Sequence, residues 1–95
     1  MTSDQILERD GVSPYLRGYY HLKDLIESYD PCLTLKAQYD RIAEKKGSTR
    51  MRVEKNCMNA LLHSSVPTGV GVKKYVARAH VELEKEKQDD KHRND

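Results

Sequence analysis

The chain has 95 residues, of which 37% are hydrophobic and 34% are charged. This length suits one domain with a modest core. We expect neither a signal peptide nor a membrane span, because no apolar stretch is long enough for either. The two cysteines, Cys32 and Cys57, show no metal-site or disulfide spacing, which favours a reducing, cytoplasmic setting.

Charge is unevenly distributed, although the net charge is only +2. Residues 1–35 and 82–95 are net acidic, whereas residues 36–55 hold seven basic and three acidic side chains. Residues 56–81 add Lys73, Lys74 and Arg78 and no acid. A basic segment of this kind is typical of a surface that meets phosphate groups, although most charge clusters are solvated helix faces.

The first 29 residues predict one short and one long helix. Residues 1–12 read as an arm or a short helix anchored by Ile6 and Leu7. Ser13 and Pro14 predict the start of a longer helix, because Ser is a favoured N-cap and Pro fits the first helical position. Apolar residues then recur at helical spacing and predict one buried stripe: Tyr15, Tyr19, Leu22, Ile26 and Tyr29.

Two further helices with a tight turn between them are predicted over residues 34–63. Thr34 can cap the first of these helices, and Gly47 ends it, because glycine tolerates the positive φ of such a turn. Ser48 or Thr49 caps the second. The spacing of a small residue, a glycine and a β-branched residue is that of a helix-turn-helix: Ala43, Gly47 and Val53.

The second of these helices has one apolar and one mixed face. The apolar face is predicted to enter the core: Val53, Cys57, Ala60 and Leu61. The opposite face carries Arg, Lys, Asn and Glu side chains, which are the groups that read base edges in the major groove. Met51 and Met58 could touch thymine methyls, pack beneath the C-terminal segment or contact a protein, whereas Leu62 is expected to pack.

The C-terminal third predicts a loop, a helix and a tail. Ser64–Gly71 is rich in turn residues and lacks the third glycine of a phosphate loop. A helix begins at Val72 and is expected to bury Val76 and Leu83. Residues 85–95 are charged and are predicted to be a frayed helical end or, as we favour, a disordered tail. The domain boundaries that follow are 1–12, 13–84 and 85–95.

No pattern of catalytic or metal-binding residues is evident. The four histidines are scattered without a ligand partner at i+3 or i+4: His21, His63, His80 and His92. No nucleophile signature occurs, and a small helical domain rarely encloses a pocket. We therefore expect no enzymatic activity, no metal, no cofactor and no small-molecule substrate.

Several segments together resemble the DNA-binding effector domain of the stage-zero sporulation response regulator (sporulation protein A), a bacterial family. Gly18-Tyr19 with Leu22 resembles its GYxxL motif, and the stretch from Thr49 to Lys55 resembles the start of its recognition helix. The remaining matches are Asp40–Lys46, Ala60-Leu61 and Pro67-Thr68. Met58 stands where the family has a third basic residue.

This resemblance implies an all-α fold of four to five helices around a helix-turn-helix, and a transcriptional regulator that binds double-stranded DNA, with homodimers possible on DNA. The side chains predicted to read bases are Arg50, Arg52, Glu54, Lys55 and Asn59. Those predicted to contact phosphates are Lys36, Lys45, Lys46, Ser48, Thr49, Lys73 and Lys74. The alternative is a protein-interaction module in which Met51, Met58 and Leu62 form an apolar docking patch.

Overall fold

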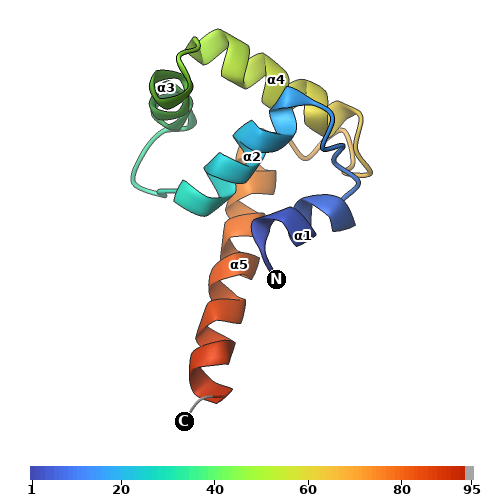
Figure 1. The fold of residues 1–95 in the computed structure, drawn as a ribbon, viewed down its shortest axis with the longest axis vertical. Helices are drawn as coiled ribbons and strands as arrows, with labels where there is room; N and C mark the ends of the chain where they lie inside the picture. Colours follow the sequence, from blue (N-terminus) through green and yellow to red (C-terminus); the bar gives the residue numbers. More distant parts are fainter. Residues whose placement is uncertain (94–95) are drawn as a thin grey trace.

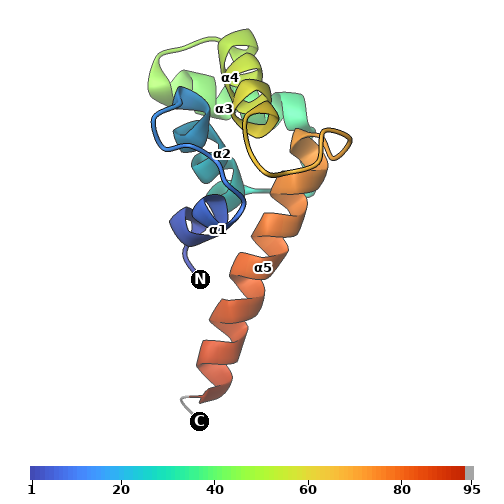
Figure 2. The ribbon, with the colours of Figure 1, turned by 90° about the vertical axis from the view of Figure 1, so that its right-hand side faces the viewer.

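The computed structural model describes the backbone of residues 1–93 and the side chains of residues 1–85. This part of the chain contains five helices and no strand: α1 (Ser3–Arg9), α2 (Arg17–Ser28), α3 (Leu35–Lys46), α4 (Arg50–Leu62) and α5 (Val72–Arg93). The all-α class predicted from the sequence is therefore confirmed. α2 lies in the middle of the bundle, and the C-terminal half of α5 projects beyond the other helices (Figures 1 and 2).

The N-terminal segment is a helix and belongs to the same core as the rest. Thr2 caps α1 through a capping box, in which the side chains and backbone N–H groups of Thr2 and Gln5 pair reciprocally. Ile6 and Leu7 are fully buried. Tyr75 of α5 donates a hydrogen bond to Asp10 over 2.9 Å, which ties the end of α1 to α5.

The predicted start of α2 at Ser13-Pro14 is wrong, because α2 begins at Arg17. Ser13 and Leu16 close a separate turn through a backbone hydrogen bond, and Leu16 is extended. Leu16 is half-buried and packs against the core, so the chain turns before the helix begins. As a consequence Tyr15, predicted to be buried, is 95% exposed.

α2 and α4 approach each other closely at Gly18. Gly18 faces the backbone of Asn56 and the side chain of Ala60, and a methyl group at Gly18 would overlap both. The absence of a side chain therefore lets α4 lie directly on α2. Leu22, Val53 and Cys57 are fully buried in the core that these helices share.

A buried glutamine fixes the connection between α2 and α3. The side-chain amide of Gln38 donates to the carbonyls of Asp30 and Leu33, and its oxygen accepts from the N–H of Asp30. Each polar atom of this buried side chain is thus satisfied. Thr34 caps α3 by accepting from the N–H of Ala37 over 3.1 Å, as predicted.

α5 carries its predicted apolar stripe on the core side. Val72, Val76 and Leu83 are buried, and His80 donates through Nδ1 to the carbonyl of Ile26 over 2.7 Å. The backbone of residues 85–93 is helical, as the end of α5, and residues 94–95 of the predicted tail lie outside the described residues. Within the described residues, every helix is too short or too polar to cross a membrane.

Candidate nucleic-acid interface

The turn between α3 and α4 has the geometry that the sequence predicts. Gly47 is left-handed, with φ 65°. Its N–H donates to Glu44, and the N–H of Ser48 donates to Ala43 over 2.8 Å, the pattern of a Schellman motif. Thr49 then caps α4 by accepting from the N–H of Arg52. Three residues therefore connect α3 to α4, and Arg50, Met51 and Arg52 at the start of α4 are exposed.

Two of the cations predicted to contact DNA lie near acids beside this turn. The Arg50 guanidinium lies 3.7 Å from Asp40 of α3, with both side chains about half exposed. The Lys46 ammonium lies 3.6 Å from Asp24 of α2, so its side chain leans back toward the core. The exposed Arg50–Asp40 pair contributes about 0–1 kcal/mol, so a phosphate could compete for Arg50, whereas the Asp24 carboxylate beside Lys46 is only 20% exposed.

His21 of α2 is buried, close enough to Lys46 at the end of α3 to feel its charge. Its Nδ1 has no hydrogen-bond partner among the described residues. Burial lowers the pKa of the imidazole, because the charged form loses its solvation, while nearby Asp24 opposes that shift. Burial therefore favours the neutral form of this ring.

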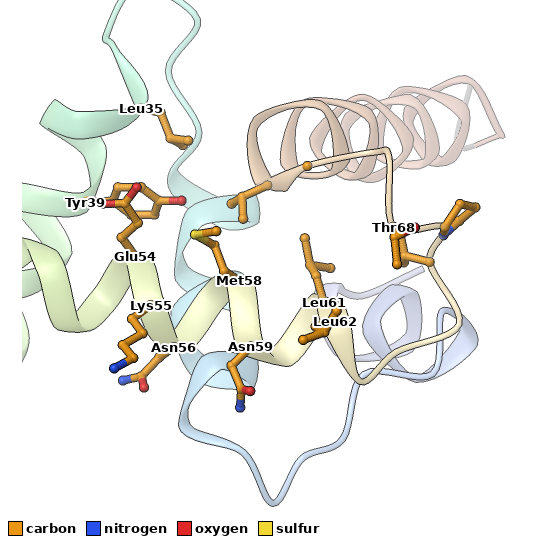
Figure 3. A pocket seen from close by; sticks show the side chains of 14 residues that line it. Leu35, Tyr39, Glu54, Lys55, Asn56, Met58, Asn59, Leu61, Leu62 and Thr68 are labelled. Carbon is orange, nitrogen blue, oxygen red and sulfur yellow. The ribbon is translucent and has the colours of Figure 1, made fainter.

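The outward face of α4 divides lengthwise into a polar half and an apolar half. Arg52, Lys55 and Asn59 are exposed along one half. Met51 and Met58 are exposed along the other, at 76% and 57%. Figure 3 shows Lys55 and Asn59 pointing to one side of α4 and Met58 to the other. Because Lys55 follows Met51 by one turn, the two halves adjoin along the helix.

A groove of about 650 Å³ runs along the apolar half. Met58 and Leu62 form its floor, the start of α3 contributes Leu35, and the loop before α5 contributes Val66. Val72 closes it at the start of α5. Leu62 is 64% exposed, so the prediction that it packs is wrong: the loop and α5 stand beside it without covering it.

Sequence reasoning missed the far wall of this groove. From the sequence, Val66 belongs to a loop and Val72 to the start of the last helix. Neither pattern indicates that both residues approach α4, because that approach depends on how the chain folds back. The usable signal was on α4 itself, where positions 51, 58 and 62 recur on one helical face.

The remaining predicted phosphate contacts surround α4 on different elements. Lys36 lies at the start of α3 and Lys45 near its end, and both are exposed. Lys73 and Lys74 are exposed in the first turn of α5, beside the groove. Ser48 is half-buried in the turn, where its N–H is already engaged. All seven basic residues of segment 36–55 are thus exposed.

Metal-binding geometry is not found in the described part of the chain, which holds no group of three or more His, Cys, Asp or Glu side chains arranged around one point. No protein-family model matches the chain, and no match was found among curated proteins or solved structures.

Proposed function

We propose that the chain is a sequence-specific DNA-binding protein that regulates transcription and places α4 in the major groove. The observation that carries this proposal is the exposure of Arg52, Lys55 and Asn59 along one half of a helix mounted by a tight glycine turn. Arg and Lys pair with guanine, and Asn pairs with adenine, through two hydrogen bonds each in favourable geometry.

Basic side chains on the helices around α4 are suited to contact the phosphate backbone of a duplex. Lys45 on α3 and the Lys73-Lys74 pair on α5 are exposed on elements that adjoin α4. Contacts from such lysines position a protein on DNA without reading sequence. The resemblance of the Thr49–Lys55 stretch to the sporulation effector family points to the same use of α4. The base-reading set proposed is Arg50, Arg52, Glu54, Lys55 and Asn59.

Selection from a pool of randomised duplexes tests this proposal directly. The protein should enrich one short sequence, and binding to it should weaken steeply with salt. With about six phosphate contacts, affinity should fall roughly a thousandfold between 50 and 200 mM salt. A folded sample that retains no duplex at low ionic strength would refute the proposal.

A second candidate function is docking of another protein in the groove beside α4. The observation that favours it is the apolar floor formed by Met58 and Leu62, which continues to Val66 and Val72. Exposed apolar surface of this kind often marks an interaction site. Such binding should change little with salt, and it should weaken when Leu62 is replaced by a polar residue.

A further inference from the structure

Base reading by the polar half of α4 does not explain why the other half of its outward face is apolar. Single exposed apolar residues are common on protein surfaces. Met51, Met58 and Leu62, however, lie within about 40° of one another around the helix axis, at 100° per residue. All three are more than half exposed. They form a continuous apolar stripe next to the side chains proposed to read bases.

The major groove offers a match for such a stripe. Besides hydrogen-bonding atoms, its edges present one apolar group, the 5-methyl group of thymine. Lys55 lies between Met51 and Met58 along the helix, and Asn59 follows Met58 directly. At 100° per residue, Met51 and Met58 lie about 40° and 60° from Lys55 around the helix axis, on the side away from Asn59. A helix that turns Lys55 toward base edges therefore also turns the two methionines toward the groove, on the flank opposite Asn59. The surrounding cations favour a polyanion such as duplex DNA over a purely apolar partner.

We infer that Met51 and Met58 select thymine, by packing on its 5-methyl group at two positions of the preferred DNA site. This inference rests on the proposed function and specifies the sequence class that the site prefers. Met58 lies seven residues after Met51, a distance of about 10.5 Å along the helix axis. Base pairs stack about 3.4 Å apart, so the two thymines lie within about three base pairs of each other, on either strand.

The test replaces thymine by uracil, which removes only the methyl group. Each thymine of the selected duplex is changed in turn, and affinity is measured at fixed salt. Burial of one methyl group is worth about a fourfold change in affinity, so two substitutions within about three base pairs of each other should each weaken binding by about that factor. Substitutions elsewhere in the site should have little effect.

Variants assign each effect to a side chain. Met58→Ala should weaken binding to the thymine duplex and abolish the uracil effect at one of the two positions, and Met51→Ala should do so at the other. Val81→Ala is the matched control, because Val81 is 58% exposed on α5, away from α4. That variant should keep both uracil effects. Because all three side chains are exposed, these substitutions should not disturb folding.

The outcomes distinguish a failure of thymine selection by the two methionines from a failure of the proposed DNA binding. A selected duplex that binds tightly but tolerates uracil at every thymine overturns the inference and leaves the proposed function standing. A selected site without thymine does the same. If no duplex binds at low salt, the proposed function fails and the inference fails with it, and the stripe is then the surface to test for protein docking.

Discussion

Replacing Gly18 by alanine should destabilise the protein, because this residue sets the distance between α2 and α4. The added Cβ would lie 2.6 Å from the Cβ of Ala60 and would overlap the carbonyl of Asn56. That carbonyl belongs to the helix backbone and cannot rotate away. The two helices must therefore separate, which costs about 3 kcal/mol, at the upper end for overpacked cores.

Alanine also favours the helix over glycine by about 1 kcal/mol, so the net loss should be roughly 2 kcal/mol. For a domain of this size, a loss of that order lowers Tm by about 8–16 °C. Thermal unfolding followed by circular dichroism measures this shift. Gly69→Ala is the control, since nothing lies within 4 Å of that position, and its stability should change by less than about 0.5 kcal/mol. A Gly18→Ala protein with unchanged Tm would refute the close packing of α2 on α4.

Three further predictions concern single sites. Gly47→Ala should lower the free energy of unfolding by about 1 kcal/mol, because φ 65° strains a side chain although the space is free, and denaturant unfolding measures this loss. The free energy of unfolding should decline as pH falls below 6.5, because His21 then gains a proton more readily in the unfolded chain than in the folded protein. His21→Asn should flatten this pH profile, whereas His63→Asn, at an exposed position, should not. A thiol reagent should label exposed Cys32 in the native protein and spare Cys57, whose pKa burial raises to about 12.

Each of these has an outcome that contradicts it. A Gly47→Ala protein as stable as the parent would mean that the turn does not require glycine. A steep acid decline that survives in His21→Asn would assign the pH dependence to other groups. Equal labelling of both thiols without denaturant would show that α4 leaves the core readily.

Local signals in the sequence were sufficient for the helix-turn-helix itself. Thr34, Gly47 and Thr49 mark ends of α3 and α4 through hydrogen bonds to their own neighbours. The local sequence is therefore sufficient to predict these helix ends. The buried face of α4 follows from helical spacing. Cys57 is fully buried and Val53 likewise, as predicted.

Features that depend on distant contacts were not predictable in this way. Ser13-Pro14 is a good local helix start, but Leu16 packs on the core in an extended conformation and delays α2 to Arg17. Leu62 is predicted to pack, but it is exposed, because its burial depends on the positions of the loop before α5 and of α5 itself. The groove beside α4 arises from the same arrangement, because Val66 is separated from α3 by the whole of α4.

The affinity of Lys55→Ala for the selected duplex and for random duplexes tests the central claim most directly, with Lys85→Ala on α5 as the charge-matched control. Lys85 is exposed and lies about 20 Å along α5 from its start. If Lys55 reads a base, its loss should cost about 1–3 kcal/mol on the selected site and clearly less on random DNA, while Lys85→Ala changes neither. Equal losses on both duplexes, or no loss beyond that of Lys85→Ala, would contradict base reading by α4.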